Sequence, residues 1–261
     1  MKQRGFSLIE LITVLVILAI VAAMGSHFMV SSTEAYIQTQ ARAKLVHRAR
    51  QALERMARQL RGALPYSLRE SNSGTCLEFL PVAAGANYVS DVPDQSNGAS
   101  ASASITTASF SVDFGTARYA AIGALGDTEI YASSPVSLAA LNSDLALGTT
   151  ASSVTLSAAK IWRRNSLQRR IFLLDHPLAF CVVGAELRVF EDFDSSFPLN
   201  SNVDPGSGGE VMAENVAADG DLFVIASGTE ERNTKVTINL SFSEGGEQVS
   251  FSQEVSIRNV P

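Results

Sequence analysis

The sequence predicts an α+β fold in which one long N-terminal helix packs on an antiparallel β-sheet domain. From residue 6 to residue 61 the apolar residues either run together or recur at three- and four-residue spacing, as they do along a helix. Beyond Pro65 the chain changes to short β-branched and aromatic runs, separated by Gly, Asn, Asp and Pro residues that favour turns. We therefore expect a helix over 6–61 and a β-rich globular domain over 62–261.

The composition fits an ordered protein that is partly embedded in a membrane. Of the 261 residues, 46% are hydrophobic and 18% are charged. The net charge of −6 conceals an asymmetry, because residues 1–61 carry nine basic and three acidic side chains, whereas residues 62–261 carry eleven and twenty-three. The acidic domain would repel phosphate groups, so we expect no nucleic-acid partner.

Residues 6–30 form the predicted membrane segment of the helix. Between Phe6 and Thr33 the only formally charged side chain is Glu10. An acidic residue at the bilayer centre costs about 2.5–3.5 kcal/mol and less near the edge, so such a carboxylate requires a partner. Lys2 and Arg4 precede the segment and keep the N-terminus cytoplasmic by the positive-inside rule.

Two other interpretations of the N-terminal region stay open. A secretory signal peptide also begins with a basic stretch, and the small residues between Ala22 and Ser26 offer a cleavage site. However, Glu10 would interrupt its apolar core, and the helical pattern continues far beyond it. A plain single-pass anchor would leave Glu10 without a role.

Residues 31–61 form an amphipathic stalk with one apolar and one basic face. The apolar face consists of Leu45, Ala49, Ala52, Leu53, Met56 and Leu60. The basic face consists of Lys44, Arg48, Arg50, Arg55, Arg58 and Arg61. Gly62 and Pro65 are stop signals, so an unbroken helix from Phe6 would be about 84 Å long and would lay its apolar face against a sheet.

The basic face has three interpretations. It is a solvated surface, or it contacts the acidic domain of an adjacent subunit, or it captures DNA. The last is the weakest, because no aromatic residues interleave with the arginines to stack on bases.

The opening residues resemble the type III signal of type IV pilins and of the pseudopilins of type II secretion. The resemblance rests on a basic leader that ends at Gly5, on Phe6, and on Glu10 within the apolar run. It implies the pilin fold, and it implies that a prepilin peptidase removes a leader peptide, residues 1–5, by cutting between Gly5 and Phe6 and then N-methylates Phe6. It also implies that Glu10 pairs with the terminal amine of a neighbouring subunit, as a carboxylate in low dielectric strongly favours a cation.

The β-rich domain contains ten candidate strands. They are Thr75–Leu80, Ala108–Phe114, Glu129–Ala132, Val154–Ala158, Arg170–Leu174, Ala179–Val183, Glu186–Glu191, Leu222–Ala226, Lys235–Ser243 and Gln248–Arg258.

Turn signals connect some of these strands. Residues 170–191 read as a meander of three strands, and Glu244-Gly245-Gly246 predicts a terminal hairpin. Low-complexity segments at Ala83–Ser104 and Asn200–Gly209 are expected to be surface loops.

Two further segments resemble larger minor pilins and the J-type minor pseudopilin. They are Ala179–Phe190 and the closing residues Glu254–Pro261. Together with the N-terminus they point to a minor pilin of the mannose-sensitive haemagglutinin (MSHA) type, in particular the O-type biogenesis component. No resemblance covers residues 82–160.

Cys76 and Cys181 are the only cysteines. Two distant cysteines in an exported chain favour one disulfide, and closing a loop of this length would stabilise the fold by about 4–5 kcal/mol in the chain-entropy model. The alternative is two buried free thiols. Neither cysteine has a CxxC partner or a nearby His, so we expect no metal site there.

Motifs for catalysis are sparse. His27 and His47 fall on the helix and His176 precedes Pro177 in a turn, and the sequence has no GxSxG, HExxH or phosphate-binding loop. The acidic cluster at 191–194, with Asp204, offers oxygen ligands for calcium, but its spacing matches no loop signature and a solvated turn is favoured.

We thus expect a non-enzymatic minor pilin without cofactor or metal, anchored by a single pass in the bacterial inner membrane with its domain in the periplasm, and then built into a filament at or near its tip. Its expected partners are a prepilin peptidase, other major and minor pilins and the pilus assembly machinery. The alternatives are a minor pseudopilin of type II secretion and, in another class, a membrane-anchored periplasmic binding protein or hydrolase.

Overall fold

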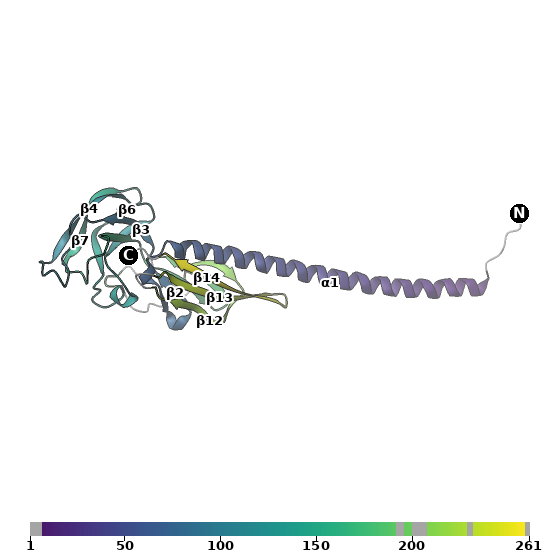
Figure 1. Ribbon diagram of the computed structural model, residues 1–261. Coiled ribbons are helices and arrows are strands. Elements are labelled where there is room, and N and C mark those ends of the chain that lie inside the picture. The colour runs from purple at the N-terminus through teal and green to yellow at the C-terminus, as the bar shows by residue number, and fades with distance from the viewer. Residues whose placement is uncertain (1–6, 192–195, 200–207, 229–231, 259–261) are drawn as a thin grey trace.

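The computed structural model describes residues 7–191, 196–199, 208–228 and 232–258. A single long helix, α1 (Leu8–Arg61), leads into a head of antiparallel sheets, as Figure 1 shows. The α+β class with a long N-terminal helix on antiparallel sheet structure is thereby confirmed. By length and composition, α1 is apolar and long enough to cross a membrane.

The two halves of α1 differ in their surroundings. Its first half projects away from the head, and large apolar side chains such as Leu8, Ile17 and Met29 are more than half exposed. The helix runs through Gly25 without a break. In the second half the predicted apolar face is buried against the sheets, with Leu45, Met56 and others fully inaccessible. The helix ends at Gly62, whose N–H donates to the Gln59 carbonyl at 3.0 Å.

The head contains three sheets rather than one. We call the first of them the central sheet; its strand order is β1-β2-β9-β10-β11. These strands are β1 (Arg69–Ser71), β2 (Cys76–Phe79), β9 (Leu178–Val183), β10 (Glu186–Glu191) and β11 (Glu210–Glu214).

The terminal sheet has the order β12-β13-β14, with β12 (Val216–Ala226), β13 (Thr234–Glu244) and β14 (Glu247–Ile257). Gly245 and Gly246 join the last two strands, and both have positive φ values, 62° and 85°. A two-residue turn in which both residues have positive φ matches the twist of the flanking strands, and Gly adopts positive φ at little energetic cost. The predicted terminal hairpin is therefore present. Together with α1, the central and terminal sheets enclose one hydrophobic core.

The third sheet is built between β2 and β9, and we call residues 80–177 the insertion. Its strand order is β3-β8-β5-β6-β7-β4. The strands are β3 (Val82–Asn87), β4 (Ser102–Ser111), β5 (Thr116–Ala121), β6 (Leu138–Ala146), β7 (Thr150–Lys160) and β8 (Arg170–Leu174). Three short 3-10 helices, η1 (Pro65–Ser67), η2 (Asn72–Gly74) and η3 (Asp127–Glu129), complete the described elements.

The predicted three-strand meander over 170–191 is wrong in its first half. Strand β8 pairs with β3 and β5, whereas β9 pairs with β2 and β10. The turn at Asp175-His176-Pro177 is therefore the point where the chain passes from the insertion back into the central sheet. Turn chemistry signals a change of direction, but it does not decide which strand lies alongside.

Two further expectations fail. Residues 129–132 form the end of a 3-10 helix and a turn, not a strand, although Ile130 and Tyr131 are buried. Part of the expected loop Ala83–Ser104 is strand β3, in which Ala83 and Ala84 are buried against β8. Alanine has a low intrinsic preference for strands, so pairing and burial decide its conformation here. Of the other expected loop, Asn200–Gly209, residues 200–207 lie outside the described part.

Candidate functional site

The N-terminal motif is the first candidate site. Gly5 and Phe6, the predicted processing residues, lie outside the described part of the chain. Glu10 lies in the first turn of α1, where its N–H donates to the Ser7 carbonyl at 3.0 Å. Its side chain is exposed, and among the described residues no basic group pairs with it. Within the described part of the chain, the Glu10 carboxylate is thus exposed and takes part in no ion pair.

The basic face of the stalk is partly neutralised within the subunit. Arg55 donates two hydrogen bonds to the Glu210 carboxylate, at 2.7 and 2.9 Å, and Arg48 lies 3.1 Å from Glu244. Hydrogen bonding and attraction from Arg55 lower the pKa of the Glu210 carboxyl, and the same hydrogen bond raises the pKa of Arg55.

These two contacts add an interpretation to those drawn from the sequence. Both arginines hold the helix to its own head, one through β11 and the other through the tip of the β13–β14 hairpin. Lys44, Arg50, Arg58 and Arg61 remain exposed on the helix. The pairing could not be predicted from the sequence, because Glu210 and Glu244 lie more than 150 residues after the arginines that they contact. No local sequence pattern connects residues so far apart.

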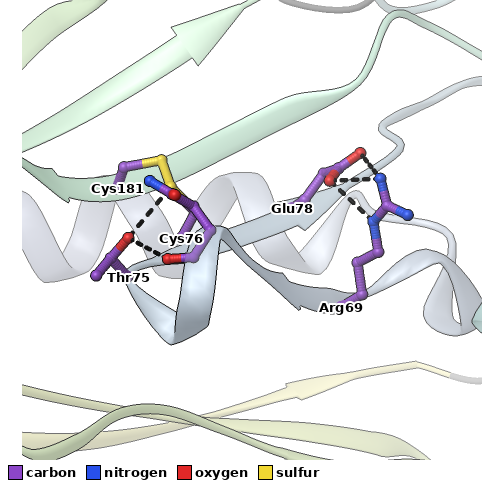
Figure 2. Close-up of a disulfide and its surroundings, with 6 residues drawn as sticks. Arg69, Thr75, Cys76, Glu78 and Cys181 are labelled. Carbon is purple, nitrogen blue, oxygen red and sulfur yellow. Dashed lines mark hydrogen bonds and ion pairs between the residues drawn. A yellow bond between two sulfur atoms is a disulfide. The ribbon is translucent and has the colours of Figure 1, made fainter. Parts of the chain in front are cut away.

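The two cysteines meet across the central sheet. Cys76 on β2 and Cys181 on β9 are direct cross-strand partners and form a disulfide, with both residues fully buried. Figure 2 shows the disulfide and Glu78, which lies on the same strand as Cys76. The disulfide thus joins β2, which precedes the insertion, to β9, which follows it.

A thiol-labelling experiment tests this bond. In the exported protein, denatured without reductant, we expect neither Cys76 nor Cys181 to react with an alkylating reagent, and both to react after reduction. Intact mass spectrometry reads out the number of labels. Labelling of either cysteine before reduction would show that the disulfide does not form.

A buried ion pair lies beside the disulfide and was not anticipated from the sequence. Arg69 on β1 faces Glu78 on β2 and donates to its carboxylate at 2.8 and 2.9 Å (Figure 2). Glu78 is fully buried, and Arg69 is only 9% exposed. The guanidinium also lies 3.6 Å from the ring centroid of Tyr131, which belongs to the insertion, and the Tyr131 hydroxyl donates to the Ser67 carbonyl at 2.8 Å. The pair therefore helps to fix the insertion on the central sheet.

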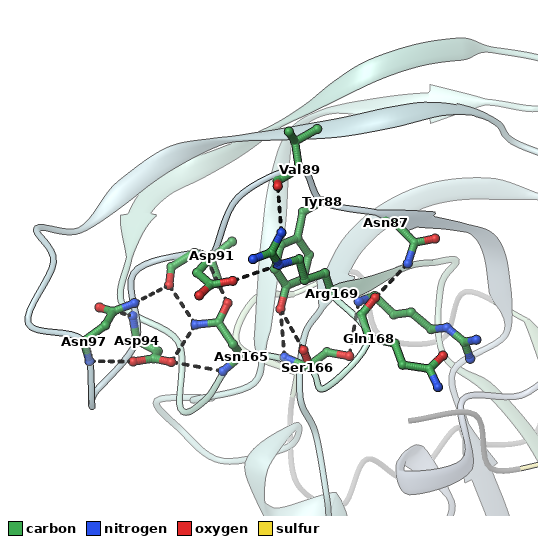
Figure 3. A network of polar contacts seen from close by, with 12 residues as sticks. Asn87, Tyr88, Val89, Asp91, Asp94, Asn97, Asn165, Ser166, Gln168 and Arg169 are labelled. Atoms are coloured by element: carbon green, nitrogen blue, oxygen red, sulfur yellow. Dashed lines mark hydrogen bonds and ion pairs between the residues drawn. The ribbon is translucent and has the colours of Figure 1, made fainter.

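A second polar network fastens two loops of the insertion (Figure 3). The Asp94 carboxylate accepts hydrogen bonds from Ser96, Asn97 and Asn165, at distances from 2.6 to 3.1 Å. The hydrogen bonds from Ser96 and Asn165 hold its pKa far below the ordinary value. An aspartate whose two oxygens are both engaged in this way serves the loop structure, because it has no free position to accept a proton from a substrate.

Glu129 is the centre of a third polar cluster. It accepts two hydrogen bonds from Arg164, at 2.7 and 2.8 Å, and one from the Ser137 hydroxyl at 2.8 Å. Burial alone would raise the pKa of the Glu129 carboxyl, but these hydrogen bonds outweigh it and the pKa is lowered. The salt bridge therefore connects the loop that precedes β8, which contains Arg164, to η3, which ends at Glu129.

Groups suited to catalysis or metal binding do not converge in the described part of the chain. His27 and His47 lie on α1, and His176 lies in the turn between β8 and β9. The described residues hold no group of three or more His, Cys, Asp or Glu that could bind a metal ion. Of the calcium ligands considered from the sequence, Glu191 ends β10, and Asp192, Asp194 and Asp204 lie outside the described residues.

A partly open cavity of ≈110 Å³ lies where η1 meets the insertion, and its lining includes Tyr66, Phe172 and Leu167. Pockets for small molecules are usually several hundred Å³, about 300 or more. This cavity is therefore smaller than a usual ligand pocket. A wider and more open hollow of ≈740 Å³ lies between η2 and β12, and its lining includes Gly74, Asp221 and Leu222.

Comparison with known proteins identifies the N-terminal region alone. A family model described as "Prokaryotic N-terminal methylation motif" matches residues 1–26. No curated protein and no solved structure matches the chain. The matched region includes Gly5, Phe6 and Glu10, and it supports a type IV pilin-like or pseudopilin-like subunit with a structural rather than an enzymatic role. Processing by a prepilin peptidase, assembly with other pilins and anchoring in the inner membrane are consistent with this match.

Proposed function

We propose that the protein is a minor pilin of a type IV pilus of the mannose-sensitive haemagglutinin type. One observation carries the pilin-like part of the proposal: the methylation motif at residues 1–26 opens a helix whose apolar segment contains a single carboxylate, Glu10. The MSHA type rests on the resemblance of residues 179–190 and 254–261 to larger minor pilins. The prepilin peptidase cuts between Gly5 and Phe6 and methylates Phe6. Before assembly the chain spans the inner membrane once, with residues 1–5 on the cytoplasmic side and the head in the periplasm.

The assembly step depends on an ion pair between subunits. Glu10 has no partner within the described chain, and cleavage at Gly5 creates a positively charged amine at Phe6. In a bundle of apolar helices, a neighbouring subunit shifted by about 6 Å along the axis, four residues at 1.5 Å each, brings that amine to the depth of the carboxylate. Apolar packing alone allows helices to slide past each other, so one charge pair per subunit sets the axial register.

The stalk and the head provide a second, electrostatic contribution. Residues 1–61 carry a balance of +6 and the remainder a balance of −12. The exposed arginines of the stalk, Arg50, Arg58 and Arg61, are available to the acidic head of an adjacent pilin. The large head and the insertion at its far end favour a place at or near the filament tip, in company with other minor pilins.

The mature N-terminus provides the direct test. In cells with a prepilin peptidase, we expect mass spectrometry of the purified protein to find an N-terminal peptide that begins with methylated Phe6. In cells without the peptidase, the chain should begin at Met1 and remain in the membrane. A mature terminus near Gly25 or Ser26 would instead identify a secretory signal peptide and contradict the proposal.

The alternative, a minor pseudopilin of type II secretion, shares the same processing. Isolation of sheared extracellular filaments separates the two. The protein should be present in these filaments if it is a pilin, and absent from them, with secretion impaired in its absence, if it is a pseudopilin.

A further inference from the structure

The hollow of ≈740 Å³ between η2 and β12 combines an apolar floor with an acidic rim, and we call it the acidic hollow. Its lining includes the buried side chains of Leu222 and Phe223 and the exposed carboxylates of Glu70 and Asp221. Neither carboxylate takes part in an ion pair within the described part of the chain. No basic side chain is among the described residues that line the hollow. This chemistry suits a guest with an apolar stem and a cationic end, as in arginine.

An irregularity in β12 shapes the rim of the acidic hollow. The ladder between β12 and β13 is interrupted there, where residues 219–222 lie opposite Asn239 alone. The Asn239 amide donates to the Asp221 carbonyl at 2.8 Å and so holds the extra residues against the sheet. Such bulges bend a strand and change the direction of its side chains. Here the bulge adds a further exposed carboxylate, Asp219, beside Asp221.

The acidic hollow lies across the head from the stalk of the same subunit. Figure 1 shows α1 along one side of the terminal sheet and β12 on the other side. The helix packs mainly on β14, whereas β12 is the strand at the opposite edge. None of the described residues that line the hollow belongs to α1. The acidic hollow is therefore separate from Glu210 and Glu244, with which the stalk arginines of the same chain pair.

The exposed side of the stalk carries cations that match the acidic hollow. At about 100° per residue, Arg50, Arg58 and Arg61 fall within an arc of about 80°, which we call the basic arc. All three side chains are exposed, and none takes part in an ion pair within the described residues. The arc also contains Glu54, so its net charge remains positive. It lies opposite the buried face of the helix, and thus points away from the head of its own chain.

The acidic hollow and the basic arc also lie at similar heights along the molecule. β13 runs beside α1, and Glu244 at its end pairs with Arg48 of the helix (Figure 1). Asn239, at the bulge, precedes Glu244 by five residues, which is about 17 Å of strand or about eleven residues of a helix alongside. A neighbour shifted by the four residues proposed above presents its helix there between about residues 55 and 63. This stretch includes two arginines of the basic arc.

From this match we infer that the acidic hollow receives the basic arc on the stalk of a second copy of this chain. The cationic ends meet the carboxylates of Glu70 and Asp221, and the apolar stems lie on the floor. The two surfaces lie on different sides of one subunit, so the contact is head-to-tail and can repeat along a filament. The inference rests on the function proposed above, and it names the surface and the partner for the electrostatic contribution.

Site-specific photo-crosslinking in intact filaments identifies the occupant. p-Benzoylphenylalanine is placed at Ala218, an exposed residue of the hollow, and at Ser153, an exposed residue of β7, as the matched control. We expect adducts from Ala218 that join two copies of this chain, with the second attachment within residues 50–61, and no such adducts from Ser153. If Ala218 formed adducts only with another pilin, or formed none, the inference would be overturned.

Two charge reversals test the chemistry of the contact. One variant carries Glu70→Arg and Asp221→Arg in the hollow, and the other carries Arg58→Glu and Arg61→Glu in the arc. With the Ala218 probe, either variant alone should give about tenfold fewer adducts between copies than the wild type, since like charges then face each other. Cells that make both variants should recover about the wild-type yield, because the reversed arc of one meets the reversed hollow of the other.

Recovery in the mixed cells also shows that both variants fold. Unchanged yields in either variant alone would overturn the inference, and so would a loss without recovery from chains that still form the Cys76–Cys181 disulfide. If a variant does not accumulate, the crosslinks of the otherwise unaltered chain decide.

These results are distinguishable from the test of the proposed function. If Phe6 is not processed and methylated, the proposed function fails. If Phe6 is methylated and the protein enters filaments, but Ala218 does not crosslink to the stalk of a second copy, only the present inference fails.

Discussion

Replacement of Glu10 by alanine is expected to reduce incorporation into filaments by about thirtyfold or more while leaving cleavage at Gly5 intact. Removing one partner of a buried, hydrogen-bonded charge pair costs about 2–5 kcal/mol, much of which comes from the charge left without a partner. In the variant, that charge is the terminal amine of a neighbouring Phe6. Glu10 is exposed and without a partner in the described chain, so the isolated subunit should tolerate the change.

Quantitative immunoblots of sheared filaments and of whole cells provide the measurement. Glu34→Ala is the matched control, because Glu34 is also an exposed carboxylate on α1 but lies beyond the apolar segment. It should enter filaments normally. Glu10→Gln retains the shape of the side chain and should fail like Glu10→Ala. Normal incorporation of Glu10→Ala would contradict a role for the carboxylate in assembly.

Glu78→Ala is expected to destabilise the head by about 3–5 kcal/mol, since it leaves the buried Arg69 cation without its carboxylate. Arg69 also contacts Tyr131, so the loss should loosen the joint that fixes the insertion. The free energy of unfolding can be measured by urea titration of the detergent-solubilised full chain. Trp162 is the only tryptophan and is fully buried in the insertion, which makes its fluorescence a direct probe.

Two variants sharpen this experiment. Glu254→Ala removes the partner of Lys235 in an exposed pair of similar length, 2.8 Å, and should cost about 1 kcal/mol or less. The double variant Arg69→Met with Glu78→Leu removes both charges and should recover much of the lost stability, because a buried ion pair is often replaceable by apolar residues. If the Glu78→Ala variant were no less stable than the Glu254→Ala variant, other groups or water would have to solvate the Arg69 guanidinium, and the prediction would be contradicted.

The sequence predicted well where the signal is local. The apolar run, the amphipathic face of the stalk and the stop at Gly62 define α1, and the structure places the predicted apolar residues against the sheets. The terminal hairpin follows from β-branched strands on either side of Gly245-Gly246, two residues that favour positive φ. Periodicity and turn chemistry act over a few residues, so they can be read without knowledge of distant contacts.

The sequence predicted poorly where alanine-rich segments form strands. β3, β5 and β6 lie within or beside the region for which no resemblance was found, and they contain few β-branched residues. Burial against neighbouring strands, as at Ala117 and Ala120, determines their conformation. A preference for strand depends on cross-strand and same-face neighbours, so it cannot be read from such segments alone.

By itself, the sequence determined the long helix, its apolar segment, the lone carboxylate at Glu10 and the methylation motif that supports a pilin-like subunit. Only the tertiary structure decided that residues 80–177 contain a sheet with a hydrophobic cluster of its own, that β8 and β9 belong to different sheets, and that Arg48 and Arg55 pair with Glu244 and Glu210. The physical reason is the range of the forces involved. A helix is specified by hydrogen bonds and side-chain spacing within a few residues, whereas the choice of strand partners and of ion pairs depends on which distant segments become buried together.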